Sequence, residues 1–245
     1  VAVVPRGFLQ VARKTKTVSQ PAIATGSSGR LELPEWVASS DNPLTSRVMV
    51  NRIWHHLIGN GLVRTTDNLG LMGEMPSQAA LLDWLAHQFV VDQWSVKKMI
   101  RRIVMSRTYR LASTGESIGR TIDPENRLIW RANRKRLTAE SIRDTILSVS
   151  GQLSMQQGGP TIRKFSQYDW GYEFNTIRRS VYVPLFRNTL LEVFETFDVA
   201  NPNVVSGRRS ETILPTQALY LMNSPFVNAE AERAGERIIR SGTTD

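Results

Sequence analysis

Residues 42–61 read NPLTSRVMVNRIWHHLIGNG and contain the start, body and end of one helix. Asn42 followed by Pro43 is typical of a helix N-terminus, because asparagine caps free N–H groups and proline has no N–H to satisfy. Apolar residues then recur at helical spacing, at Val50, Ile53, Trp54, Leu57 and Ile58. Gly59 and Gly61 follow, as expected at a helix C-terminus. This stretch predicts an amphipathic helix with one apolar face.

The same organisation returns in three later segments. Ser77, Ser95 and Thr138 each precede an apolar stripe at helical spacing, so we predict that they cap helices. The stripes are Leu81, Leu82, Leu85 and Phe89; Val96, Met99, Ile100, Ile103 and Val104; and Ile142, Ile146 and Val149. A last helix is expected from Ser224-Pro225 to about Arg240. The chain is therefore predicted to be mainly α, an irregular multi-helix bundle of about seven or eight helices.

Residues 158–187 interrupt this helical pattern. Tyr168, Trp170, Tyr172 and Phe174 alternate with other residues, and a period of two with aromatic side chains predicts a strand. Residues 180–184, SVYVP, form a second short candidate strand. We therefore expect a small β-hairpin excursion near residues 161–184, carried by a single helical domain of residues 30–245.

Composition is that of a globular protein with a hydrophobic core. Of the 245 residues, 41% are hydrophobic and 22% are charged. No apolar run approaches the roughly 18 residues of a membrane span. The absence of cysteine excludes disulfides, cysteine-based zinc sites and thiol nucleophiles. Residues 1–29 lack periodicity and contain several breakers, so we expect a connecting segment from a larger parent protein.

The chain is strongly basic, with a net charge of +9 and a pI of about 10.3. Such a balance attracts polyanions, which include nucleic acid, anionic polysaccharide and anionic membrane surfaces. Alternatively, the charge keeps the domain soluble or complements an acidic neighbouring domain. The bulk charge leaves both interpretations open.

Two groups of basic residues are candidates for anion binding. On the predicted helix after Ser95, the pairs Lys97/Arg101 and Lys98/Arg102 place like charges at i, i+4, which costs a helix a few tenths of a kcal/mol per pair. An arginine-rich segment follows, with members at Arg127, Arg131, Arg134, Lys135 and Arg136. Each group either binds an anion through its cations or is a solvated face or an internal ion-pair network.

The aromatic stripe Tyr168, Trp170, Tyr172 and Phe174 either stacks on sugar rings or bases, or packs on the core. The loop before residue 210 is dense in polar residues, with Asp198, Asn203, Arg208 and Arg209 as candidates for a converging polar pocket. The same residues also suit buried caps and turns. Ligand-binding candidates in these two segments are therefore Tyr168, Trp170, Tyr172, Arg208 and Arg209.

Catalytic signals are few. Glu192, Glu195 and Asp198 supply acids at i, i+3 and i+6, which suits paired-carboxylate hydrolysis or a solvated helix face. The three histidines, His55, His56 and His87, show no metal-binding signature, and adjacent histidines point about 100° apart on a helix. We predict no metal and no cofactor.

Several stretches together resemble one known family. They begin with residues 42–54, 61–68 (GLVRTTDN) and 106–109 (SRTY), and continue with 123–127 (DPENR), 130–137 (WRANRKRL), 201–209 (NPNVVSGRR), 215–219 and 223–227. In this order they resemble the planctomycete-specific PSD domain of unknown function over roughly residues 30–230. The resemblance implies export to the periplasm, cell envelope or extracellular space. It also implies a C-terminal position in a large protein, often behind a cytochrome-c-like domain.

These observations lead to one leading hypothesis and two alternatives. The leading hypothesis is a non-catalytic binding or scaffolding module that prefers anionic polymers, with extracellular polysaccharide favoured over nucleic acid. One alternative is a hydrolase that acts on envelope or environmental polysaccharide through Glu192, Glu195 and Asp198. The other is an accessory domain that docks a haem-bearing electron-transfer domain of the parent.

Overall fold

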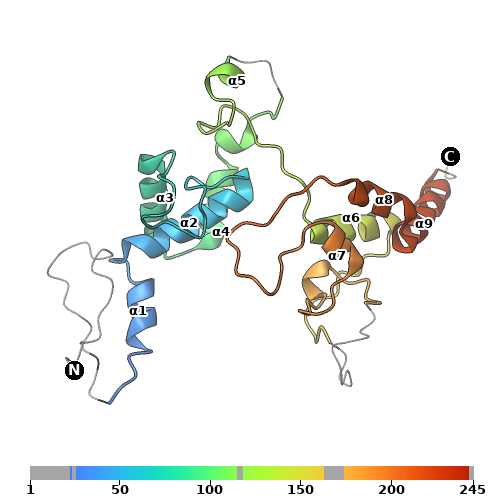
Figure 1. Ribbon diagram of the computed structural model, residues 1–245, viewed down its shortest axis with the longest axis horizontal. Helices are drawn as coiled ribbons and strands as arrows, with labels where there is room; N and C mark the ends of the chain where they lie inside the picture. Colours follow the sequence, from blue (N-terminus) through green and yellow to red (C-terminus); the bar gives the residue numbers. More distant parts are fainter. Residues whose placement is uncertain (1–22, 24–25, 115–117, 163–173, 243–245) are drawn as a thin grey trace. The chain divides into compact units, whose positions relative to one another are not determined.

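The computed structural model describes residues 23, 26–114, 118–162 and 174–242. These residues form two compact units, which comprise residues 1–135 and 136–245 of the chain (Figure 1). The first unit contains α1 (Glu32–Ala38), α2 (Pro43–Ile58), α3 (Ala79–Val91), α4 (Val96–Val104), η2 (Thr108–Arg110) and α5 (Gly119–Ile122). The second contains α6 (Ala139–Ser150), η3 (Ser180–Tyr182), α7 (Glu192–Thr196), α8 (Pro215–Asn223) and α9 (Pro225–Ser241). The mainly helical class is confirmed, whereas the single domain of residues 30–245 stays a prediction.

Most of the predicted helix ends are confirmed. The side chain of Asn42 accepts from the Leu44 N–H at 3.0 Å, Ser95 caps α4, and Thr138 caps α6. Gly151 ends α6 in the left-handed conformation, at φ 80°. Each of these caps joins residues that are neighbours in the sequence, which is why the sequence predicts them.

Ser77 is an exception, because the prediction that it caps α3 is wrong. The helix begins at Ala79, and Gln78 at the cap position makes no side-chain capping bond. The Ser77 hydroxyl instead donates to the carbonyl of Leu62 at 3.3 Å, and the Ser77 N–H donates to the same oxygen at 2.8 Å. A contact across fifteen residues has replaced the local cap.

The core of the first unit lies between α2, α3 and α4, which pack against one another (Figure 1). The side chains buried there follow the predicted stripes: Val50, Ile53, Trp54, Ile58, Leu82, Leu85, Phe89, Met99 and Ile103. Leu62 and Val63 complete the cluster from the loop after α2. The stripe predicted for α4 is only partly correct, because Met99 and Ile103 are buried whereas Val96 and Ile100 are exposed.

A buried polar side chain fixes the loop that leaves α2. Asn51 is fully buried, and its amide donates to the Val63 carbonyl and accepts from the Val63 N–H, both at 2.9 Å. A Cβ at Gly61 would lie 2.3 Å from the Val63 carbonyl oxygen. Glycine is therefore required at position 61, because any side chain would collide with the turn that Asn51 holds.

The second unit is built around α6, which packs against α9, α7 and η3. Its core contains Ala139, Val183, Val193, Phe194, Phe197 and Tyr220. The rings of Phe197 and Tyr220 meet edge to face, with 5.8 Å between their centroids. Burial raises the pKa of the Tyr220 hydroxyl.

The structure does not support the predicted β-hairpin. Residues 180–184, the second candidate strand, begin with the 3₁₀ turn η3, and the described part of this region holds one isolated bridge, between Ser154 and Arg178. The first candidate strand lies almost wholly outside the described residues, which resume at Phe174.

Helix α6 explains why residues 176–180 form no hairpin. Arg143 is buried and donates to the carbonyls of Thr176 and Arg178, the second at 2.9 Å. Asp144 accepts from the Ser180 N–H at 2.8 Å. Burial lowers the pKa of Arg143, and the carboxylate of Asp144 opposes that shift. Backbone groups that a hairpin would pair with a second strand are thus paired with α6.

Within the described ranges, no helix is long and apolar enough to cross a membrane.

The clamp made by Asn51 predicts a stability effect. We expect Asn51→Ala to lower the free energy of unfolding by roughly 3 kcal/mol, because it leaves the buried N–H and C=O of Val63 unpaired. Urea denaturation of the full chain, followed by circular dichroism, measures this change. Arg52→Ala is the matched control on the exposed side of α2. Equal midpoints for the two variants would contradict the clamp.

Candidate functional site

The net charge belongs to one unit. Residues 1–135 hold 19 of the 31 basic residues and 10 of the 22 acidic ones, a difference of +9. Residues 136–245 hold 12 basic and 12 acidic residues, so their net charge is zero. A surface that attracts polyanions is therefore best sought in the first unit.

Helix α4 divides its four basic residues into two pairs. Met99 and Ile103 turn inward and are buried. At 100° per residue, Lys97 and Arg101 lie on the opposite side of the helix, where both are exposed. Neither side chain has a hydrogen bond or ion pair with any residue that the structure describes. This pair is available to an external anion.

The other pair is occupied within the protein. The Arg102 guanidinium donates to Asp92 at 2.7 Å, and the Lys98 ammonium lies 3.9 Å from the same carboxylate. Arg102 also lies over the indole ring of Trp84, with its Cζ 5.5 Å from the ring centroid. These contacts join α4 to α3 and to the turn between them. Lys98 and Arg102 therefore have a structural role within the first unit.

Positive charge continues beyond the end of α4. Residues 97–110 contain six basic residues and no acidic one. Arg107 and Arg110 are exposed, and η2 contacts α4. We call the exposed set Lys97, Arg101, Arg107 and Arg110 the basic surface. It forms the candidate binding site with the best electrostatic support.

The arginine-rich segment is mixed in its contacts. Arg131 lies over the ring of Trp130, at 5.2 Å from the centroid, and is half-buried. Arg136 lies over Phe197 at 5.5 Å and also donates to the carbonyl of Thr212. Arg134 is exposed, and its side chain has no hydrogen bond or ion pair within the described ranges. An internal network thus accounts for most of this segment, and Arg134 stays a predicted ligand contact.

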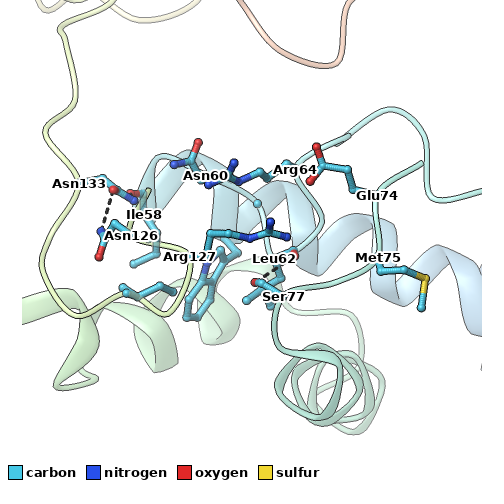
Figure 2. Close-up of a pocket in the computed structure, with 13 residues that line it drawn as sticks. Ile58, Asn60, Leu62, Arg64, Glu74, Met75, Ser77, Asn126, Arg127 and Asn133 are labelled. Atoms are coloured by element: carbon cyan, nitrogen blue, oxygen red, sulfur yellow. Dashed lines mark hydrogen bonds between the residues drawn. The ribbon is translucent and has the colours of Figure 1, made fainter. Parts of the chain in front are cut away.

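A small polar hollow lies in the first unit (Figure 2). Asn133, Ile58 and Asn126 stand at one end, Glu74 and Met75 at the other, and Arg64 and Arg127 extend between them. Its internal volume is about 20 Å³, room for about one water molecule. Ligand pockets for small molecules are usually ten or more times larger.

The polar groups around the hollow largely bind one another. Asn126 donates to the Arg131 carbonyl at 2.8 Å and to Asn133 at 2.9 Å, while Arg64 pairs with Glu125 at 2.9 Å. The backbone N–H groups of Leu128 and Arg127 bind Asp123 and hold the pKa of its carboxyl below the usual range. The hollow is therefore best explained as a place where hydrogen bonds hold the loop after α2 against the loop of residues 123–133.

The polar loop of the second unit does not converge on one pocket. Asp198 accepts from the N–H and the hydroxyl of Thr212, whereas Asn203 donates to the Arg187 carbonyl at 3.3 Å. Arg209 binds both carboxylate oxygens of Glu140, at 2.7 and 2.8 Å. Arg208 is exposed, and its side chain has no partner among the described residues. Three of the four candidates thus bind different groups, and Arg208 binds none among the described residues.

The three candidate carboxylates differ in the same way. Glu192 and Glu195 are exposed on the five-residue helix α7, while Asp198 follows it at φ 60° and is held by Thr212. Asp198 therefore has a structural role, because its carboxylate holds Thr212 next to the end of α7. Catalysis by Glu192 and Glu195 remains a prediction.

The histidines show no site among the described residues. Asp83, four residues before His87 on α3, binds Arg47 at 2.6 Å. Among the residues described, no group of three or more His, Cys, Asp or Glu side chains is placed to hold a metal ion. Tyr168, Trp170 and Tyr172 lie outside the described residues.

Sequence reasoning missed Asp92 and Trp84. Asp92 lies in the turn between two helices and decides which cations of α4 are neutralised. Trp84 falls outside the apolar stripe of α3 and remains 49% exposed. A helical projection of residues 79–91 would have flagged it, since it lies opposite Leu82, Leu85 and Phe89.

The Arg209–Glu140 pair predicts a pH-dependent stability. Burial alone would raise the pKa of Glu140, but the Arg209 guanidinium and other donors lower it below its ordinary value of 4.5. The stabilisation is therefore present above that value and is lost as the pH falls. We expect Arg209→Ala to cost about 1 kcal/mol at neutral pH and little at about pH 3.

Urea denaturation at both pH values measures this difference. Arg208→Ala, which removes the same charge from the adjacent exposed residue, is the matched control. An equal effect of the two variants at neutral pH would contradict the assignment.

Comparison with known proteins gives the family and no activity. No curated protein matches the chain, and no solved structure does. A family model, PSD1, described as a protein of unknown function (DUF1553), matches residues 29–244. That match takes in both compact units and nearly the whole sequence, and the chain therefore belongs to the PSD1 (DUF1553) family.

Proposed function

We propose that this domain is a non-catalytic binding module for anionic polymers and that the basic surface of the first unit makes the contact. One observation carries the proposal: Lys97 and Arg101 stand side by side on the outer face of α4 without an acidic partner among the described residues. Like charges at i, i+4 destabilise a helix. A bound anion removes that repulsion and releases counterions, both of which favour binding.

The form of the surface supports a polymer rather than a small ion. Lys97 and Arg101 share one face of α4, and Arg107 and Arg110 lie at η2, which contacts α4, so the four cations are distributed over two adjacent elements. A single small anion would contact one or two of them at most. A chain of repeated negative charges contacts several at once, and each contact adds to the affinity.

Export and the choice of polymer rest on the resemblance to planctomycete PSD domains. An exported domain at the C-terminal end of a large parent meets extracellular polysaccharide more readily than nucleic acid. We therefore favour an acidic polysaccharide of the cell envelope or the surroundings. The alternative, hydrolysis by the three carboxylates, has weaker support, because Asp198 is already hydrogen-bonded to Thr212.

A second candidate function is docking to a neighbouring domain of the parent, such as a haem-bearing one. A different observation supports it: Leu71, Met72 and Met75 are 105%, 89% and 83% exposed in the loop between α2 and α3. Adjacent exposed apolar side chains are typical of interaction surfaces. This loop is separate in sequence from the basic surface, so the two functions are compatible.

The proposal predicts a loss of affinity on removing the free pair of cations. Lys97→Ala/Arg101→Ala should weaken binding to dextran sulfate and polygalacturonate roughly tenfold at low salt. It should also reduce the slope of log Kd against log salt by about 2, since each lost contact reduces it by about 1. Fluorescence anisotropy of labelled polymers, over a series of salt concentrations, measures both quantities.

Arg187→Ala/Arg208→Ala is the matched control, because it removes two exposed charges from the second unit. Neutral dextran should not bind any of the proteins. Equal loss in the two double variants would show that bulk charge alone, rather than the basic surface, attracts the polymer. If the unaltered chain binds no acidic polymer, the polymer hypothesis is wrong and the docking function remains.

A further inference from the structure

An exposed tryptophan lies against Arg102, the residue that follows Arg101 of the basic surface in the sequence. Trp84 belongs to α3, on the side opposite the buried residues Leu82, Leu85 and Phe89. It is 49% exposed, although large aromatic side chains contribute most when they are buried. Its position on the outer face of a well-packed helix is not explained by the core of the first unit.

The surrounding contacts hold the indole ring in place. The Arg102 guanidinium lies over the ring, and Asp92 holds that guanidinium at 2.7 Å. The Nε atom of Arg102 is buried and has no hydrogen-bond partner within the described ranges. A guanidinium over an aromatic ring is attracted by the negative charge of the ring face. The indole ring of Trp84 is therefore held in position by Arg102, which is itself held by Asp92.

Helix α3, which carries Trp84, packs against the helix that carries the unneutralised cations Lys97 and Arg101. Arg102 comes directly after Arg101 on α4, and α3 packs against α4. The exposed ring and the unneutralised cations thus belong to two helices that pack against each other, with Arg102 in contact with the ring. A ligand that satisfies both has an apolar ring face and negative groups within one or two units of the polymer.

Resting on the proposed function, we propose that Trp84 is the specificity-determining residue of the basic surface and recognises an acidic polysaccharide. One sugar ring stacks its C–H face on the exposed part of the indole. The carboxylate or sulfate groups of that sugar and its neighbours bind Lys97 and Arg101. Charge supplies the attraction, and the ring selects polymers whose units carry a stackable face.

The surroundings of Trp84 favour a polysaccharide over nucleic acid. Proteins that bind single-stranded nucleic acid stack successive bases on a series of aromatic side chains. Helices α3 and α4 and the turn η2 offer two exposed aromatic rings other than histidine, Trp84 and the 40% exposed Tyr109, rather than a series along one strand, and Phe89 is buried. Duplex DNA keeps its bases stacked inside and presents no free ring to a single exposed indole.

The test compares Trp84→Leu with Trp84→Phe in the full chain, using polygalacturonate, inorganic polyphosphate and oligo(dT) as probes. We expect Trp84→Leu to weaken polygalacturonate binding roughly five- to tenfold, as expected for loss of one stacking contact. The slope of log Kd against log salt should not change, because stacking releases no counterions. Polyphosphate binding should stay within twofold, and Trp84→Phe should retain most of the polygalacturonate affinity.

A third variant, Ile122→Ala, controls for the loss of an exposed apolar side chain elsewhere in the first unit. Thermal unfolding of each variant shows whether it is folded, and Trp84→Phe keeps the test valid should Trp84→Leu be unstable. Equal weakening for polygalacturonate and polyphosphate, or none for either, would overturn the role of Trp84 and leave the proposed function intact. A larger loss for oligo(dT) would identify single-stranded nucleic acid as the partner instead. If the unaltered chain binds none of the three probes, the proposed function itself fails.

Discussion

The two hydrogen bonds between Asn51 and the backbone of Val63 are the constraint on which the first unit depends. They turn the chain sharply after α2, at a point where Gly61 leaves no room for a side chain. This turn brings Leu62 to the core and its carbonyl to Ser77, which then sets the start of α3. A buried amide that satisfies two backbone groups stabilises such a turn more specifically than apolar packing does.

The position of α4 follows from that arrangement, and so does the division of its charges. Because α3 and α4 pack on α2 from successive segments, the turn between them places Asp92 beside one flank of α4. That flank carries Lys98 and Arg102, while Lys97 and Arg101 face solvent. A single carboxylate thus separates cations that hold the fold from cations that remain available to a partner.

Sequence patterns predicted local features and missed those that depend on distant residues. The caps at Asn42, Ser95 and Thr138 and the apolar stripes are set by residues within one or two turns. Ser77 follows the same local rule but binds Leu62 instead, and at the expected second strand the Ser180 N–H donates to Asp144 of α6. Arg209 and Glu140 are 69 residues apart, so no local pattern shows that this arginine is paired. Which charges are free is therefore a property of the fold.

Recognition by an open surface, rather than in a pocket, is consistent with where the polar groups of the first unit lie. The hollow beside Asn126 and Asn133 holds about one water molecule, and these two side chains bind each other. The unneutralised cations lie instead on the outer face of α4 and at η2, and these elements and the adjacent α3 carry the exposed rings of Tyr109 and Trp84. On such a surface each contact is weak and exposed to salt, so affinity must come from repetition along the ligand. Selectivity must then come from the feature that charge does not provide, which on this surface is the ring of Trp84.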